Sequence, residues 1–251
     1  MSGPSRFICG PGGSIPALDL SIRQPSRGYR FSVDAVLLAG FAAACGGRTI
    51  LDLGTGSGVL LLFLARLLPG KKRGIGVEIQ RELYEFARTN FRENRLEKTL
   101  SAVHGDFRDP QPGLSPGGFD LVVSNPPFRR LGEGRRSPDF QKQIARHEVT
   151  CTISGLFRAA RGYLSPRGRF AMICVPQRLP EILRCAASEG IFPERLRFVH
   201  PYADRHANRV LFAGTRRTSA GVSVLPPLVV HAAKGRFHPE VVRLYRGITP
   251  P

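Results

Sequence analysis

Neither a membrane protein nor a disulfide-bonded or zinc-bound scaffold is indicated by this sequence. Its longest apolar run, residues 58–65, stops at Arg66, far short of the roughly 20 residues that a membrane-spanning helix needs. The N-terminal residues contain no apolar stretch of signal-peptide length, so we expect a cytoplasmic protein. The five cysteines are scattered, with no CxxC pair and no Cys/His cluster. We therefore expect no bound metal and no framework of disulfide bonds.

Acidic residues are also scarce. The chain has 19 Asp and Glu against 37 Lys and Arg, which gives a net charge of +18. Eleven of these excess positive charges fall within residues 126–217, where arginine dominates. Guanidinium groups match phosphate oxygens and stack on bases, so the imbalance indicates a nucleic acid partner. The simpler alternative is a genome rich in arginine codons, with the arginines only solvating the surface.

Apolar residues make up 42% of the 251 residues, enough for the core of one large α/β domain. Short apolar runs alternate with amphipathic segments along the chain. Strands are expected at 48–54, 73–79, 100–106, 119–128, 168–175, 194–200 and 208–214, and helices at 33–45, 58–68, 81–94, 153–164 and 179–186. This alternation predicts a doubly wound, mostly parallel sheet of seven strands with helices on both faces.

The two ends of the chain differ from this central pattern. Residues 1–23 are rich in glycine, proline and serine, and we expect a flexible tail there. The α/β domain then covers residues 24–217. Residues 218–251 are partly extended, and we expect a C-terminal extension that packs on the domain.

A glycine-rich loop, DLGTGSG (52–58), joins the first predicted strand to the next helix. Glycines at this point let the backbone turn tightly and approach a ligand closely. A dinucleotide site would read GxGxxG, whereas here the third glycine comes one position early, at Gly58, and Asp52 precedes the loop. No Gly-Lys-Ser/Thr follows, which excludes a Walker-type phosphate loop. The acid favours a cationic or zwitterionic ligand, and the glycine spacing disfavours a NAD(P)-dependent oxidoreductase.

Two further acids stand at the ends of the second and third predicted strands. In a doubly wound sheet, Glu78 points at the crevice and is suited to accept both ribose hydroxyls of a ligand. Asp106 lies over the same crevice, where it is suited to accept from an adenine amine. Each acid alone is equally typical of a helix N-cap or a turn. Three acids at successive strand ends after one glycine loop favour a binding site.

The fourth predicted strand ends in SNPPF (124–128), where two prolines stop the strand and stiffen the backbone. A planar amine needs two acceptors for its two N–H groups. The Asn125 side-chain oxygen and the Pro126 carbonyl supply them, and Phe128 is placed to stack on the ring that bears the amine. A rigid turn with a packed phenylalanine is the plainer alternative. The combination with the glycine loop favours transfer to an amine.

Several segments together resemble the bacterial tRNA(Val) adenine-37 N6-methyltransferases, within the small-domain methyltransferases. They are GYRFSVDAVLLAGF (28–41), GVEIQ (76–80), VVSNPPF (122–128), ARHE (145–148) and PPL (226–228). The resemblance spans roughly residues 24–246. It implies a Rossmann-like class I fold, S-adenosylmethionine as methyl donor, S-adenosylhomocysteine as product and tRNA as partner. Phe128 stands where the family often has tyrosine, which keeps the stacking and removes the phenol hydroxyl.

The resemblance also implies roles for individual residues. Cofactor contacts are expected from Arg30, Phe31, Asp34, Asp52, Gly54, Thr55, Gly56, Gly58, Glu78, Ile79, Asp106, Phe107 and Asn125. Catalytic contacts are expected from Asn125, Pro126, Pro127 and Phe128, and an RNA contact from Arg146. The place of Arg129, Arg130, Arg135 and Arg136 directly after the fourth strand predicts that they also contact the RNA backbone. For His147 and Glu148 a structural pair is favoured over a catalytic one. Without the resemblance, Phe31 reads as a core residue and Asp34 as an acid at a helix N-terminus.

Other activities remain compatible with the same motifs. Protein glutamine methyltransferases use this motif on a side-chain amide, but they carry an N-terminal helical domain, and here only about 30 residues precede the first core helix. DNA adenine and ribosomal guanine methylation are nearer alternatives. A non-catalytic RNA-binding protein that kept the fold is a further one, disfavoured by the intact DLGTGSG and NPPF segments.

Overall fold

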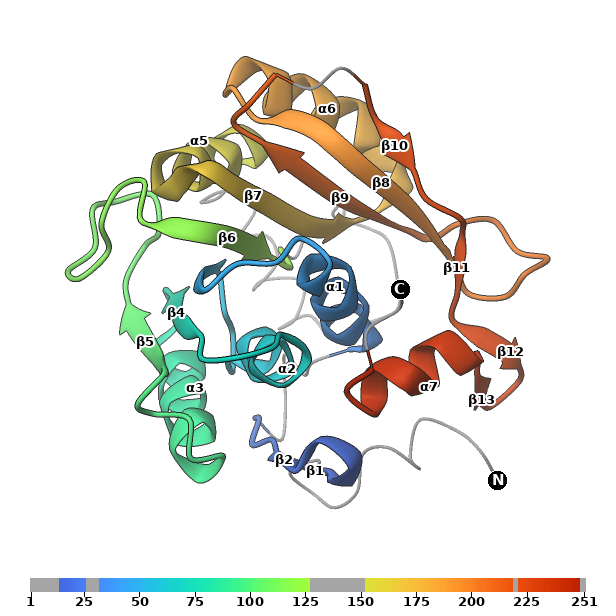
Figure 1. Ribbon diagram of the computed structural model, residues 1–251, viewed down its shortest axis with the longest axis horizontal. Helices are drawn as coiled ribbons and strands as arrows, with labels where there is room; N and C mark the ends of the chain where they lie inside the picture. Colours follow the sequence, from blue (N-terminus) through green and yellow to red (C-terminus); the bar gives the residue numbers. More distant parts are fainter. Residues whose placement is uncertain (1–13, 26–31, 127–151, 219–220, 249–251) are drawn as a thin grey trace, which may run out of the picture.

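The computed structural model describes residues 14–25, 32–126, 152–218 and 221–248 (Figure 1). Its centre is a twisted sheet with the strand order β10-β8-β9-β7-β6-β3-β4-β5, and β11 also pairs with β8. The seven long strands are β3 (Thr49–Leu53), β4 (Arg73–Glu78), β5 (Leu100–His104), β6 (Phe119–Ser124), β7 (Leu164–Cys174), β8 (Phe192–His200) and β9 (Arg209–Thr215). The short edge strands are β10 (Ser223–Val224) and β11 (Leu228–Val229).

Six of the seven long strands are parallel. Only β9 runs the other way, between β7 and β8. The predicted doubly wound, mostly parallel sheet is therefore confirmed, with two short strands added outside β8. Because the strands are parallel, all their carboxyl ends meet at one edge of the sheet, and the amino edge lies opposite.

Helices cover both faces of the sheet. They are α1 (Val33–Ala43), α2 (Val59–Leu67), α3 (Arg81–Glu93), α5 (Ile153–Tyr163), α6 (Leu179–Ser188) and α7 (Pro239–Tyr245). One core lies under α1, α2, α3 and α7, and a second core lies under α5 and α6. Within the described ranges, no helix has both the length and the apolar character needed to cross a membrane.

The N-terminal segment departs from the prediction. Residues 14–23 form the small hairpin of β1 (Ser14–Ile15) and β2 (Leu20–Ser21) around the 3-10 turn η2 (Pro16–Leu18). Ile15, Leu20 and Ile22 are almost fully buried in the first core. The prediction of a flexible tail was wrong for residues 14–23. The high glycine, proline and serine content of the segment drew attention away from the few apolar side chains that are buried. Residues 1–13 lie outside the described residues.

Strand ends also shift for local reasons. β6 stops at Ser124, before the two prolines that the sequence pattern had included up to residue 128. Proline has no N–H to give to a neighbouring strand, so pairing ends there. β7 begins at Leu164, directly after α5, because a bulge in its pairing with β6 takes up residues between Leu164 and Arg169.

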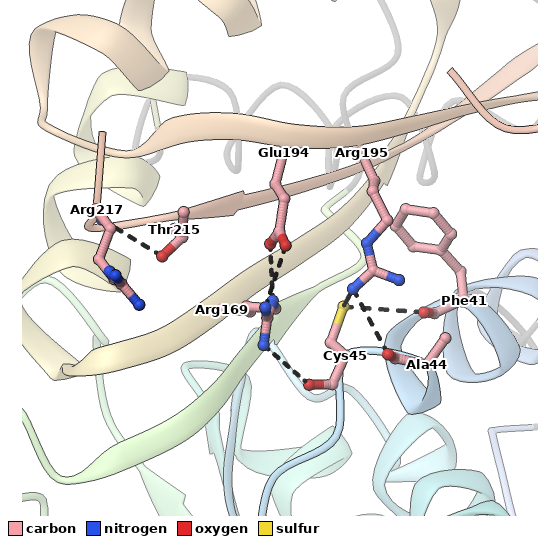
Figure 2. A network of polar contacts seen from close by, with 8 residues as sticks. All are labelled: Phe41, Ala44, Cys45, Arg169, Glu194, Arg195, Thr215 and Arg217. Carbon is pink, nitrogen blue, oxygen red and sulfur yellow. Dashed lines mark hydrogen bonds and ion pairs between the residues drawn. The ribbon is translucent and has the colours of Figure 1, made fainter. Parts of the chain in front are cut away.

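Arginine side chains help to hold the amino edge of the sheet (Figure 2). Arg169 on β7 reaches over the intervening β9 to Glu194 on β8, with an Nε–Oε2 distance of 2.7 Å. Arg195 donates to the carbonyl oxygen of Ala44 at 3.5 Å and to Sγ of Cys45 at 3.6 Å. These contacts join β7, β8 and the end of α1. Part of the arginine excess therefore stabilises the fold.

The C-terminal extension is folded onto the domain. After β11 it forms the hairpin of β12 (His231–Ala233) and β13 (Arg236–Phe237), and then α7. Val241, Leu244 and Tyr245 are buried on the inner side of α7. Leu244 lies directly against Gly40 of α1, where any Cβ would collide with it. This glycine allows the two helices to approach closely.

Candidate functional site

A pocket opens at the carboxyl edge of the sheet, where β3 and β6 end side by side. It collects residues from the start of α1, the glycine loop, the start of α2 and the end of β6. They are Ala35, Asp52, Gly54, Thr55, Ser57, Val59, Leu60 and Asn125. The glycine loop and the Asn-Pro corner, which are far apart in the sequence, therefore share one pocket.

A hydrogen bond holds the two halves of this pocket together. β3 and β6 are in parallel register, with Asp52 beside Val123. The buried Ser124 hydroxyl donates to the carbonyl oxygen of Leu53 at 2.7 Å. The chain thus leaves β6 next to the glycine loop, with Asn125 and Pro126 half-buried. Sequence reasoning missed this role of Ser124, although a lone hydroxyl at the end of an apolar strand was a signal.

The three glycines of the loop have different roles. Gly54, Gly56 and Gly58 all have positive φ angles, of 79°, 58° and 79°. Gly54 faces open space, so a ligand can approach its backbone closely. At Gly58 a Cβ would lie 2.6 Å from the Phe91 ring. Gly58 is therefore required for packing α2 against α3, a role that the sequence motif did not distinguish from ligand contact.

Asp52 is a buried acid with one unused oxygen. Its Oδ2 accepts a hydrogen bond from the Thr55 hydroxyl at 2.7 Å. Its Oδ1 is buried without a hydrogen-bond partner among the residues that the structure describes. Burial raises the pKa of this carboxyl to about 7, and the nearby Glu78 adds to the rise. An unsatisfied acceptor in a pocket fits the ammonium group of a zwitterionic ligand.

Glu78, at the end of β4, is almost fully buried. Its Oε2 accepts from the Gly56 N–H at 2.9 Å, and its Oε1 accepts from the Gln80 N–H at 2.9 Å. These bonds orient the carboxylate and shape the glycine loop at the same time. The next residue, Ile79, exposes 45% of its surface although it is apolar. An exposed apolar side chain beside an oriented carboxylate suits a ligand with a flat ring and neighbouring hydroxyls.

Asp106 follows β5 and has a partner that the sequence did not predict. Arg108 donates hydrogen bonds to the Asp106 carboxylate from its backbone N–H and from its guanidinium, whose Nε lies 2.9 Å from Oδ1 and 3.0 Å from Oδ2. These bonds lower the pKa of Asp106. An adenine amine must therefore share this carboxylate with Arg108. Phe107 is half-buried and packs against the second core.

Other predicted contacts are placed differently or lie outside the described residues. Asp34, at the start of α1, forms an ion pair with Arg209 of β9 at 3.1 Å, while its neighbour Ala35 lines the pocket. Arg209 carries no local sequence signal for this contact. The predicted residues outside the described part of the chain are Arg30, Phe31, Pro127, Phe128, Arg129, Arg130, Arg135, Arg136, Arg146, His147 and Glu148.

Asn90 on α3 connects the glycine loop to the N-terminal segment, and the sequence analysis missed it. Its side chain is fully buried. Its Nδ2 donates to the carbonyl oxygens of Ser57 at 2.8 Å and Arg23 at 2.9 Å, and its Oδ1 accepts from the Arg23 N–H at 2.7 Å. The signal was a polar residue on the buried face of an amphipathic helix, which requires partners.

Known proteins are similar to this chain in both sequence and fold. The family model described as methyltransferase small domain matches residues 33–184. A curated protein from Porphyromonas gingivalis strain W83, named tRNA1(Val) (adenine(37)-N6)-methyltransferase, is 33% identical over 232 residues, which are 89% of each chain. A relative of the same name from Tolumonas auensis is 25% identical and covers 93% of this chain and 95% of its own.

Among solved structures, a predicted O-methyltransferase from Agrobacterium tumefaciens has a TM-score of 0.70. It is 24% identical, and the match covers 87% of this chain and 98% of that chain. A geranyl diphosphate C-methyltransferase from Streptomyces coelicolor, solved with S-adenosyl-L-homocysteine, has a TM-score of 0.55 at 17% identity, covering 72% and 79%. At these identities the likeness shows a common fold.

Proposed function

Since the chain belongs to the methyltransferase small domain family and uses S-adenosylmethionine as methyl donor, we propose that its methyl acceptor is N6 of an adenine in a tRNA. The observation that carries the proposal is that Asn125 lines the same pocket as Asp52 and Gly54. The names of the relatives support adenine 37 of a valine tRNA as the target. A tRNA substrate also supports the proposal that the protein acts in the cytoplasm.

The residues of the pocket fit the cofactor. Asp52 Oδ1 is free to accept from its ammonium group, and Gly54 leaves room for close approach of the backbone. Beside the pocket, Glu78, which accepts from the Gly56 N–H, would accept the ribose hydroxyls, and the exposed Ile79 would offer an apolar surface to the adenine ring. When bound, the cofactor supplies an electrophilic methyl group on a sulfonium.

Asn125 and Pro126 would orient the acceptor. The Asn125 side-chain oxygen and the Pro126 carbonyl each accept one N–H of the planar amine, so the nitrogen lone pair is turned toward the donor side of the pocket. Both acceptors also stabilise the positive charge that develops on that nitrogen. Phe128 is proposed to stack on the base once it has left its neighbours in the anticodon loop, where unstacking costs little.

The proposal is tested with labelled S-adenosylmethionine, total tRNA and nucleoside mass spectrometry. We expect N6-methyladenosine in one valine tRNA. Asn125→Ala should reduce turnover about 100-fold or more, because the amine loses an oriented acceptor. Label that appears only on protein glutamine would replace this proposal with the glutamine alternative. Full activity of Asn125→Ala would refute the role of Asn125.

A further inference from the structure

We propose that the β8–β9 loop and the C-terminal extension form a second RNA-binding surface, which contacts the phosphate backbone of the substrate tRNA beside the pocket. We call it the C-terminal face and define it by the loop 201–208 together with β12, β13 and α7. The inference rests on the proposed tRNA substrate. It is separate from the arginines at 129–146, and it gives the C-terminal extension a function.

The loop of this face leaves the sheet at the same edge as the pocket because of the sheet topology. β8 runs parallel to β6, so His200 and Ser124 end their strands at the same edge of the sheet. The loop 201–208 leaves from this edge, as Figure 1 shows. Where the loop returns into β9, Arg209 pairs with Asp34, which precedes the pocket residue Ala35.

The loop is fixed in shape by its own hydrogen bonds. The His200 ring nitrogen Nδ1 lies 2.7 Å from the carbonyl oxygen of Arg205. The Arg205 N–H donates to the carbonyl oxygen of Tyr202 at 3.1 Å, and the Asn208 N–H donates to that of Val199 at 2.9 Å. The Arg205 side chain is 72% exposed. A preformed loop loses little conformational freedom when it binds a partner.

A column of aromatic rings joins this loop to the C-terminal extension and to α2. Ring centroids are 5.4 Å apart for Tyr202 and His231, and 5.1 Å apart for His231 and Phe237. Phe237 stacks on Tyr245 at 5.5 Å, and Tyr245 meets Phe63 of α2 edge-on at 6.2 Å. The face is therefore one packed unit, anchored on the helix that follows the glycine loop.

In the loop 201–208 the exposed Asp204 lies 3.9 Å from Arg205 and offsets its charge, so the excess positive charge of this unit lies on the C-terminal extension. Its exposed cations outside the loop are Lys234, Arg236, Arg243 and Arg246. The described part of the C-terminal extension has one acid, Glu240, whose carboxylate is held by Arg197 at 2.6 and 3.0 Å. No ion pair joins the four cations to any described residue. Arg169 at the amino edge differs, because its charge is neutralised by Glu194 (Figure 2).

Unpaired cations on a rigid surface are suited to phosphates, since binding releases counterions from the RNA. The face variant replaces Lys234, Arg236, Arg243 and Arg246 with glutamine. The control variant replaces Arg48, Lys71, Arg73 and Arg167, which are exposed at or near the amino edge, with glutamine. Both variants have the same net charge. The measurements are tRNA affinity over a range of salt concentrations, and cofactor affinity.

We expect the face variant to bind tRNA about 10-fold or more weakly at ~0.1 M salt. The slope of its affinity against salt concentration should correspond to about 2 to 4 fewer counterions released on binding. The control variant should stay within about 3-fold of wild type, and cofactor affinity should be unchanged in both. Equal tRNA affinity and salt dependence in the two variants would overturn the inference. If the wild-type protein binds tRNA but methylates none, the proposed function is refuted. The comparison of tRNA affinity between the face variant and the control variant still tests the C-terminal face.

Discussion

Asp52 combines deep burial with an unsatisfied oxygen, and its protonation state should therefore control cofactor binding. Its pKa rises from the ordinary 3.8 to about 7 because burial disfavours the charged form. The folded protein thus holds a proton that the unfolded chain releases. This carboxyl contributes stability at low pH, and the contribution is lost as the pH rises from about 4 to about 7.

Binding of a cationic ammonium requires the ionised form of Asp52. We expect cofactor affinity to increase about 5- to 10-fold between pH 6 and pH 7.5, as the carboxyl loses its proton. Asp52→Asn should bind the cofactor weakly, with an affinity that is nearly constant over this range. Isothermal titration calorimetry at several pH values measures both. A wild-type affinity that is flat over this range would contradict the assignment.

Some residue contacts could be read from the sequence and others could not. Asp52, Glu78 and Asn125 stand at strand ends, and parallel strands bring such ends together whatever the details of packing. Ser124, Arg108 and Asn90 depend on register and on partners that composition does not specify. Asp34 shows the same limit, because its partner Arg209 lies 175 residues away in the sequence.

At the scale of elements, the long strands and helices were predictable because each carries its own burial pattern. β3 is mostly apolar apart from Thr49 and Asp52, and α3 has one apolar face. The strands β10 to β13 have only two or three residues each, too few for any periodicity. The N-terminal hairpin is equally short. It is held by side chains of α3, which no local pattern reveals.

Asn90 of α3 and Asn94, the C-cap residue of that helix, hold that N-terminal segment, and only Asn90 also reaches the glycine loop. Asn90 bonds to Arg23 and to Ser57, whereas Asn94 bonds to Ser21 and to the Asn90 backbone. Replacing either with alanine should lower the free energy of unfolding by about 1–3 kcal/mol, since buried backbone groups lose their partners.

Only Asn90→Ala should affect cofactor binding. We expect its KM for S-adenosylmethionine to rise several-fold with the KM for tRNA unchanged, because the Ser57 carbonyl and the loop around it are released. Asn94→Ala is the matched control and should keep the wild-type KM for the cofactor. Steady-state kinetics below both melting temperatures distinguish the variants. Equal cofactor KM values would show that Asn90 only stabilises the fold.

For the whole molecule, the positive charge divides into structural and exposed parts. Arg169, Arg197 and Arg209 are paired with acids inside the fold. Four other arginines, at 129, 130, 135 and 136, follow the Asn-Pro corner in the sequence. Replacing these four with alanine should weaken tRNA binding and flatten its salt dependence, with little change in cofactor affinity. Filter binding at several salt concentrations would detect this, and unchanged tRNA affinity would contradict it.

The bond between Ser124 and Leu53 has a consequence for how the two halves of the pocket are held together. It joins the glycine loop, proposed to hold the cofactor, to the Asn-Pro corner, proposed to orient the acceptor, and the pairing of Asp52 with Val123 supports the same junction. Solved structures named as an O-methyltransferase and as a C-methyltransferase share the fold in which this junction forms.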